Sequence, residues 1–389
     1  MIRRIDYRTD AGRQALDALR AALDAEQGVV SGGEAAGEVE AAARRILDDV
    51  RARGDAAVCE ATARFDGVDL APAALGVPAE AIEAAYEAAD PEFLATATRI
   101  RDRVRAFQRQ VLARPPAPLA DDGRRLRLLY RPLARVGVYV PGGRAFYPST
   151  VLMTAVPALA AGVPEVAVAC PPSADGEVHA AVLAVCRVAG IAEVYRMGGV
   201  QAIAAFAYGT QAVPAVEKIV GPGNAYVQAA KRLVFGRVDI DGLAGPSEVV
   251  VLADATADAA LVAADLLSQA EHDPGSAILV TPEGALADAV AEELQRQLAA
   301  LARAEAAREA LERYSAIVVT ADLDEAVRVT GSRRNTWRFR RPRRKRCCAT
   351  SAARGRCSSA GTPPWRSAIT WPGPATRCRR AGRHGGRAG

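Results

Sequence analysis

Gln269 and His272 are the residues whose types and spacing could hold a metal ion. They lie three positions apart in a segment predicted to be a helix that ends at Asp273-Pro274, so both side chains share one helix face. Imidazole is a preferred zinc ligand, whereas an amide oxygen is a weaker one. A histidine near a helix end is more often a cap or a surface residue, so the spacing alone indicates only a candidate.

Three glycine-rich turns are a second candidate site, for a nucleotide. They are Val140–Gly143, Met197–Gln201 and Gly221–Tyr226, and each follows an apolar run that we expect to be a strand. Ligands of open parallel sheets bind at the carboxyl ends of the strands. None of these turns is the dinucleotide fingerprint, because Tyr226 stands where a third glycine would be, and each alone is an ordinary structural turn. Lys231-Arg232 in the following helix receives no role, because such pairs are usually solvated.

The size and composition of the chain favour two domains and a cytoplasmic protein. The 389 residues are 50% hydrophobic, enough for one large or two medium cores. We find no apolar run long enough to cross a membrane and no hydrophobic signal core after Met1. Cys59, Cys170 and Cys186 are widely spaced, which favours buried free thiols over a disulfide framework or a structural zinc cluster.

The elements that must position these residues form an α/β pattern. Residues 8–112 carry apolar side chains at helical spacing, and from Leu133 short apolar runs alternate with helix-like stretches. Continuous apolar strands between helices are typical of parallel sheets covered on both faces. We therefore expect two Rossmann-like domains with mainly parallel sheets and a helical N-terminal region. The predicted strands are Val136–Val140, Glu165–Ala169, Glu193–Met197, Lys218–Val220, Val249–Leu252, Ala277–Thr281 and Ala316–Thr320.

Five segments together resemble the histidinol dehydrogenase family. They are Gly137–Gly143, Gly198–Ala204, Lys218–Val227, Ala244–Val249 and Leu266–His272, and the resemblance runs from about residue 35 to 330. It implies an oxidation of L-histidinol to L-histidine through a bound aldehyde, in histidine biosynthesis, with two NAD consumed. It also implies one zinc ion, whose main task is to orient the substrate.

The resemblance also assigns individual residues. Gln269 and His272 match zinc ligands that also contact the substrate, and Ser247 matches a substrate-contacting serine in the turn after Gly245-Pro246. Without the family, Ser247 would be read as a turn or helix cap. The NAD-contacting positions, one in each glycine turn, are matched by Tyr139, Gln201 and Asn224.

The resemblance and the pattern together predict a domain division. We expect 1–115 to pack as a helical part with 248–330 in one α/β domain, and 116–247 to form the Rossmann-like domain that contacts NAD. The family resemblance implies an intertwined homodimer, which the unusual tail of this chain puts in doubt.

The composition changes abruptly near Gly331. Residues 331–389 hold 17 of the 50 Lys and Arg and none of the 45 acids, so residues 1–330 carry 33 basic and 45 acidic side chains, a net charge of −12. This tail has no periodic apolar pattern, and we expect it to be irregular and disordered. The family's Ala-Pro-Glu-His-Leu-Glu motif, whose Glu and His are the acid/base pair, is absent, so no catalytic residue is assigned.

We hypothesise that a shifted reading frame produced this tail. With suitable codons, regrouping by one base converts Arg334–Phe339 into Pro-Glu-His-Leu-Glu-Val, and Ser367–Thr376 into a segment like the one that supplies the family's aspartate ligand. We therefore expect negligible activity for this chain, because the acid/base pair and two further zinc ligands are missing.

Two other classes of function compete with this interpretation. A non-catalytic polyanion-binding protein would use the basic run Arg338–Arg346, with Trp337 and Phe339 interleaved, but such binding would be non-specific, and we expect neither a specific nucleic acid nor a membrane as partner. A relative of the aldehyde dehydrogenases would need a nucleophilic cysteine, and none of the three cysteines before residue 331 has a convincing setting.

Overall fold

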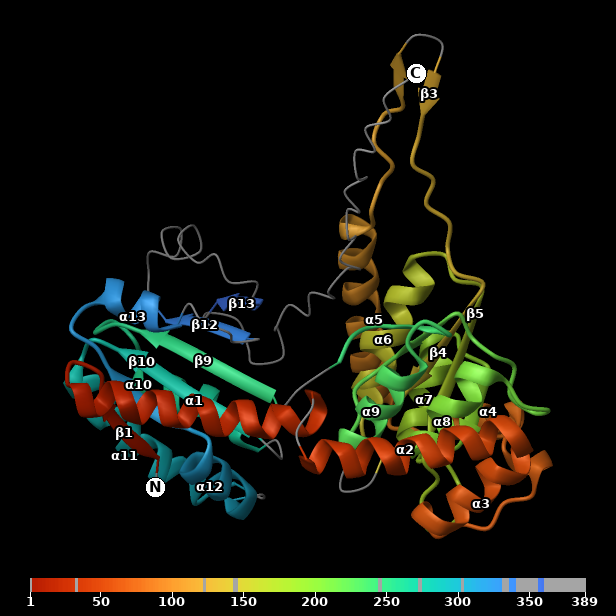
Figure 1. The fold of residues 1–389 in the computed structure, drawn as a ribbon, viewed down its shortest axis with the longest axis horizontal. Coiled ribbons are helices and arrows are strands. Elements are labelled where there is room, and N and C mark those ends of the chain that lie inside the picture. Colours follow the sequence, from red (N-terminus) through yellow and green to blue (C-terminus); the bar gives the residue numbers. More distant parts are fainter. Residues whose placement is uncertain are drawn as a thin grey trace, which may run out of the picture.

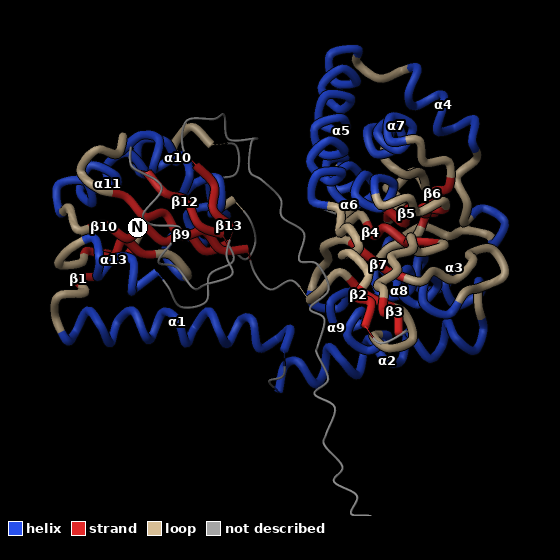
Figure 2. The backbone as a smooth tube through the Cα atoms, turned by 90° about the horizontal axis from the view of Figure 1, so that it is seen from above, coloured by secondary structure: helices blue, strands red, loops and turns tan. Residues whose placement is uncertain are grey.

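The structure is a computed structural model of the chain. It describes residues 2–31, 34–121, 124–142, 146–243, 247–271, 275–301 and 304–330, and the strands 336–340 and 356–359. Side chains are described for these residues except 24–31, 34–36, 121, 247 and the last two strands. Two parallel sheets lie in separate lobes, joined through the first two helices (Figures 1 and 2). The predicted α/β class with parallel, helix-covered sheets is confirmed.

The first sheet has five parallel strands in the order β6–β5–β4–β7–β8. They are β4 (Arg135–Tyr139), β5 (Glu165–Cys170), β6 (Glu193–Arg196), β7 (Lys218–Val220) and β8 (Asp239–Ile240). The helices that follow strands are α6 (Pro148–Ala160), α7 (Ala180–Ala189), α8 (Gly199–Tyr208) and α9 (Ala225–Val234). All five residues of β4 are buried, as expected for a strand covered on both faces. A Cβ on Gly137 would lie 2.7 Å from the Phe206 ring, so this glycine allows α8 to pack closely on β4.

The second sheet has the order β1–β11–β10–β9–β12–β13, and its described strand pairs are all parallel. Its strands are β1 (Arg3–Asp6), β9 (Ser247–Ala253), β10 (Gly275–Thr281), β11 (Ala316–Val319), β12 (Thr336–Arg340) and β13 (Arg356–Ser359). One face is covered by α10 (Ala259–Ala270), α11 (Gly284–Leu298) and α12 (Ala304–Arg313), the other by α1 (Asp10–Ser31) and α13 (Leu323–Thr330). The expectation of an irregular tail does not hold for β12 and β13, because β12 pairs with the edge of β9 and β13 pairs with β12.

The helical N-terminal part is divided between the two sheets. Only β1 and α1 join the second sheet, whereas α2 (Glu34–Arg53), α3 (Asp55–Asp66), α4 (Ala79–Glu87) and α5 (Pro91–Val111) pack against the first, with the short 3-10 helix η1 (Pro72–Ala74) between α3 and α4. Leu47 and Val50 of α2 share a core with Phe206, and Ile82 of α4 shares the opposite core with α6 and α7. The expectation that 1–115 packs with 248–330 therefore does not hold for 34–111. Apolar periodicity shows that a helix buries one face, but not which sheet covers it.

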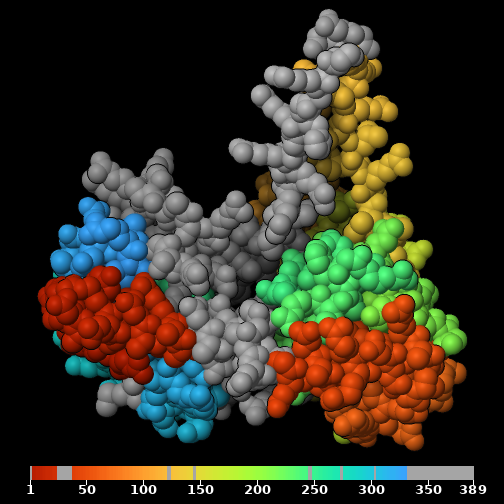
Figure 3. Space-filling view, viewed as in Figure 1, coloured from red at the N-terminus to blue at the C-terminus, as the bar shows by residue number. Residues whose placement is uncertain are grey.

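An exposed arm connects α5 to β4. It contains the antiparallel pair β2 (Leu119–Asp121) and β3 (Arg124–Leu126), and its described side chains from Val111 to Pro132 are all exposed. In Figures 1 and 3 the arm stands clear of the lobe that carries it, as the yellow segment. No helix in the described ranges is both long and apolar enough to cross a membrane.

Candidate functional site

The three glycine turns meet at the carboxyl edge of the first sheet. Tyr139 ends β4, Gln201 lies in the first turn of α8 after β6, and Asn224 lies directly before α9, after β7. All three line one cavity of about 1230 Å³. These residues belong to three separate loops along the sequence, and the fold brings them to one site, as expected for a ligand crevice at the strand ends.

Tyr139 links the first turn to the second. Its side chain is buried, and its hydroxyl oxygen accepts a hydrogen bond from the Gly199 backbone nitrogen at 3.2 Å. Burial raises the pKa of the phenol above its ordinary value, so the hydroxyl stays neutral. The residue therefore fixes the start of α8 next to the end of β4.

Gln201 is held by an acidic residue that sequence analysis missed. The Gln201 side chain is 1% exposed, and its Nε2 donates to Asp66 Oδ2 at 3.4 Å. Burial raises the pKa of the Asp66 carboxyl to about 6. Asp66 is the last residue of α3 and lines the cavity with Arg45 of α2 and Phe65 of α3. Nothing in the helical pattern marked these residues, because their role depends on which sheet α2 and α3 cover.

Asn224 is the N-cap of α9. Its Oδ1 accepts from the Val227 backbone nitrogen at 3.1 Å, and its amide NH2 group is not used in this cap. The expectation that Lys231 is solvated is wrong: its side chain is 1% exposed and its Nζ donates to the Gly221 carbonyl oxygen at 2.9 Å. Val227, Lys231 and Val234 share one face of α9, so the helical spacing already placed Lys231 on the apolar stripe.

Glycine is required where the turns approach one another. Gly221 has φ +127°, and a Cβ there would lie 2.1 Å from the Tyr139 carbonyl oxygen. A Cβ on Gly198 would lie 2.5 Å from Cγ of Pro171, which also lines the cavity. Gly221 therefore needs both the backbone freedom and the small size of glycine, whereas Gly198 needs only the small size.

The predicted metal and substrate residues are only partly placed. Ser247 is the first residue of β9, in register with Gly275 of β10, and Gln269 lies in the last turn of α10. Ser247 therefore lies at the amino end of its strand, and Gln269 lies at the end of the helix that precedes the amino end of β10. The Gln269 Nε2 atom is buried without a hydrogen-bond partner among the described residues. His272 and the side chain of Ser247 lie outside the described residues.

The structure does not bring Gln269 into the large cavity. Gln269 is absent from the described lining of that cavity, and no group of three or more His, Cys, Asp or Glu that could hold a metal occurs among the described residues. The assignments of Ser247, Gln269 and His272 stay predictions. The basic run Arg338–Arg346 lies outside the described residues except for the backbone of its first three positions.

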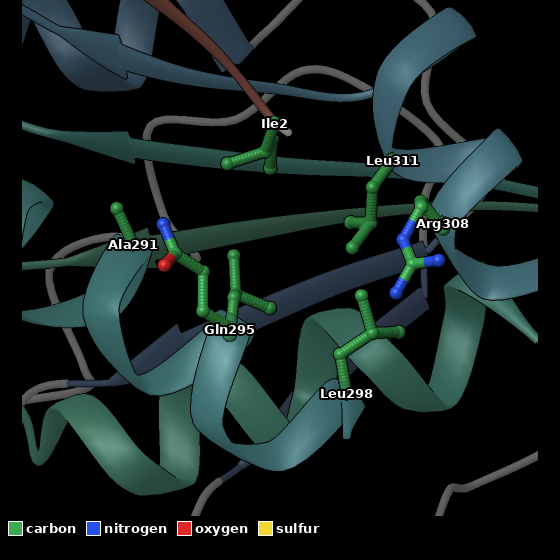
Figure 4. Close-up of a pocket in the computed structure, with 7 residues that line it drawn as sticks. Ile2, Ala291, Gln295, Leu298, Arg308 and Leu311 are labelled. Atoms are coloured by element: carbon green, nitrogen blue, oxygen red, sulfur yellow. The ribbon is translucent and has the colours of Figure 1, made fainter. Parts of the chain in front are cut away.

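A second, smaller cavity lies away from all of these residues. It has a volume of about 260 Å³ and is lined mainly by aliphatic side chains from Ile2, α11 and α12, with Gln295 and Arg308 among them (Figure 4). None of the predicted site residues takes part in it.

The cysteines before residue 331 are poor nucleophiles. Cys59, Cys170 and Cys186 are free thiols and buried. Burial raises the pKa of the Cys170 thiol to about 12 and raises the pKa of the other two. A nucleophilic cysteine must be a thiolate near neutral pH, so these three residues do not meet the requirement of an aldehyde dehydrogenase mechanism.

Comparison with known proteins shows to which family this architecture belongs. A family model described as histidinol dehydrogenase matches residues 31–333. The chain belongs to the histidinol dehydrogenase family. The curated histidinol dehydrogenase of Rhodopirellula baltica is 50% identical over 287 residues, and that of Heliobacterium mobile is 51% identical over 286. The crystal structure of the enzyme from Elizabethkingia anophelis is similar with a TM-score of 0.77 and 30% identity, over 82% of this chain and 73% of that one.

The family match covers the body of the chain only. The alignment with the Rhodopirellula relative covers 74% of this chain and 62% of that protein, and the alignment with the Heliobacterium relative covers 73% of this chain and 67% of that protein. The match to the family model ends at residue 333, next to the composition break at Gly331. The boundary drawn from charge alone therefore coincides with the boundary drawn from similarity.

Proposed function

We propose that this chain carries the NAD-binding part of a histidinol dehydrogenase, the NAD-dependent oxidoreductase that converts L-histidinol to L-histidine through a bound aldehyde. One observation carries the proposal: Tyr139, Gln201 and Asn224, taken from three loops, line a single cavity. Its volume of about 1230 Å³ exceeds the range of about 300–1000 Å³ that is ordinary for small-ligand pockets, which suits an extended dinucleotide. When bound, NAD supplies the hydride acceptor.

The residues of the cavity bind and orient that cofactor. Asp66 holds the Gln201 amide at 3.4 Å, so the amide faces a ligand in a fixed orientation. The amide NH2 group of Asn224 remains a donor after Oδ1 has capped α9. Arg45 and Arg64 line the same cavity and supply positive charge for a pyrophosphate.

Calorimetric titration with NADH tests this assignment. We expect saturable binding, weakened about tenfold by Gln201→Ala, because a lost hydrogen bond to a charged or polar ligand is worth about 1.5 kcal/mol. Gln110→Ala, on the exposed side of α5, is the matched control and should bind as the parent does. Equal NADH affinity in Gln201→Ala and in the parent would contradict the assignment of this cavity to NAD.

This chain provides only some of the ligands that a zinc site needs. Catalytic zinc sites use three protein ligands and structural sites four. The resemblance supplies Gln269 and His272. The unpaired atom of Gln269 is Nε2, a hydrogen-bond donor that does not bind zinc, so the amide oxygen would be the ligand, and two ligands fall short of a complete site. We propose weak zinc binding, which equilibrium dialysis with metal analysis measures. One tightly held zinc per chain would contradict it.

Catalysis should be lost in this chain. The family's acid/base motif Ala-Pro-Glu-His-Leu-Glu does not occur in the sequence, and general acid–base catalysis contributes about 10²- to 10⁴-fold in rate. We expect no histidinol-dependent NADH formation from the purified chain. A gene with one base inserted or removed near codon 334, to restore the family frame, should be active. Activity of the unrepaired chain, or DNA codons that cannot yield the motif, would refute the frameshift.

A homodimer in the cytoplasm completes the proposal. The arm exposes Leu119, Leu126, Leu128 and Leu129 by 57–66% each, and Leu119 and Leu126 are paired across the two strands. Several large apolar side chains exposed on one short segment suggest an interaction site. Light scattering should find a dimer that Leu126→Lys with Leu128→Lys converts to a monomer, whereas Leu243→Lys, at an exposed loop, should not. A cytoplasmic location agrees with three free thiols.

A further inference from the structure

A buried ion pair lies behind the Gly221–Asn224 turn. Lys231 of α9 is 1% exposed and its ammonium pairs with Asp241 Oδ1. The same ammonium donates to the Gly221 carbonyl oxygen at 2.9 Å, and the Gly221 backbone nitrogen donates to Asp241 Oδ2 at 2.8 Å. One ion pair therefore satisfies both backbone polar groups of Gly221, its N–H and its carbonyl oxygen.

The turn needs this support because it leaves the sheet at Gly221. The residue follows β7 directly, and its φ of +127° lies where L side chains are strained. A buried peptide group outside a ladder must find partners elsewhere. Asp241 is itself fixed, since its backbone nitrogen donates to the Ile219 carbonyl oxygen at 3.2 Å. The sheet thus fixes the position of Asp241, the Asp241 carboxylate pairs with the Lys231 ammonium, and both side chains bind the backbone of Gly221.

The held turn carries the groups that face the cavity. Gly221 lies against the Tyr139 backbone, and three residues later Asn224 caps α9 at the cavity wall. Lys231 and Asp241 do not line the described cavity, so they act on a ligand only through the turn. We propose that the Lys231–Asp241 pair is a positioning device that fixes the Gly221–Asn224 turn, and with it Tyr139 and Asn224, for the dinucleotide. This rests on the proposed NAD function of the cavity.

Removing two charged groups from water costs free energy, which argues that the Lys231–Asp241 pair does more than stabilise the fold. Burial lowers the pKa of the Lys231 ammonium, and Asp241 opposes this by favouring the charged form. Replacing a buried ion pair by neutral groups of similar volume is often neutral for stability. Positioning and folding can therefore be separated by substitution.

A second Lys–Asp pair, which joins β7 to β8, provides a matched control. Lys218 Nζ lies 2.5 Å from Asp239 Oδ2, at the start of β7 and β8, with the aspartate 50% exposed. It touches neither Gly221 nor the described cavity lining. The same substitutions at this pair report the effect of losing a Lys–Asp bridge without disturbing the turn.

The experiment measures NADH affinity by calorimetry in the full chain and in three variants, Lys231→Met, Lys231→Met with Asp241→Asn, and Lys218→Met with Asp239→Asn. We expect at least tenfold weaker binding in both Lys231 variants, because a turn displaced by a fraction of an ångström presents Asn224 wrongly. The Lys218 variant should bind as the parent does. Circular dichroism confirms folding, and if Lys231→Met does not fold, the paired variant carries the test, since it leaves no uncompensated charge.

The outcomes separate this inference from the one it rests on. Parent chain that fails to bind NADH overturns the proposed cofactor site itself. Parent chain that binds, together with a folded Lys231 variant of equal affinity, overturns the positioning role alone. Equal losses in the Lys231 and Lys218 variants also overturn it, because the effect would then belong to the loss of any Lys–Asp bridge in this part of the fold.

Discussion

Gly198→Ala adds one methyl group where α8 begins, against Pro171 of the cavity wall. Gly198 is the N-cap of α8 with φ −121° and ψ −166°, an extended backbone that alanine adopts freely. Its effect is therefore steric alone. The new Cβ would lie 2.5 Å from Cγ, 2.8 Å from Cβ and 3.4 Å from Cα of Pro171, whereas carbon atoms pack at about 3.5–4.0 Å. The proline ring cannot swing away as a flexible side chain would.

The magnitude follows from this contact. Overpacking by a methyl group in a tight site costs about 1–3 kcal/mol, so we expect the free energy of unfolding to fall by that amount. The displaced helix start carries Gly199 and Gln201, so NADH affinity should also fall, by about tenfold if one hydrogen bond is lost.

Urea unfolding followed by circular dichroism measures the stability, because all three tryptophans lie after residue 331 and their fluorescence would not report on the sheets. Gly76→Ala is the control: a Cβ there meets nothing within 4 Å, and the change should stay within about 0.5 kcal/mol. If Gly198→Ala and Gly76→Ala have the same stability and the same affinity as the parent, the close packing of α8 on Pro171 is refuted.

Three further predictions concern other buried groups. Burial raises the pKa of Asp66 from 3.8 to about 6, so between these pH values the folded chain holds a proton that the unfolded chain has lost. The free energy of unfolding should therefore fall as pH rises from 4 to 6. Urea titrations across this range should detect the fall in the parent chain, and Asp66→Asn should abolish the Asp66 contribution to it. Cys59, Cys170 and Cys186 should resist alkylation at pH 8 until urea is added, as peptide mass spectrometry measures, and ready labelling of native Cys170 would contradict its burial. Phe206→Ala should lower stability by about 3–5 kcal/mol, because its ring is fully buried against Gly137, and a loss below 1 kcal/mol would contradict that packing.

The central strands of both sheets were predictable because their apolar runs are continuous. β5 and β10, for example, are buried along nearly their whole length. β1 and β8 were missed, since Arg-Arg-Ile-Asp and Asp-Ile are short, polar and at sheet edges. An edge strand is recognised by its neighbour rather than by its own pattern.

The site was predictable where it lies in the loops and not where helices complete it. Tyr139, Gln201 and Asn224 sit in glycine turns that the family resemblance marks. Asp66 lies at the end of a helix, and no local pattern tells that α3 covers the first sheet near Gln201. Lys231 could have been found, because it occupies the apolar stripe of α9, where a lysine must have a buried partner.

A crystal structure of the chain grown with NAD⁺ tests the central claim most directly. We predict the dinucleotide in the cavity at the carboxyl ends of β4, β6 and β7, in contact with Tyr139, Gln201 and Asn224. NAD⁺ bound at any other surface, with this cavity empty, would contradict the account.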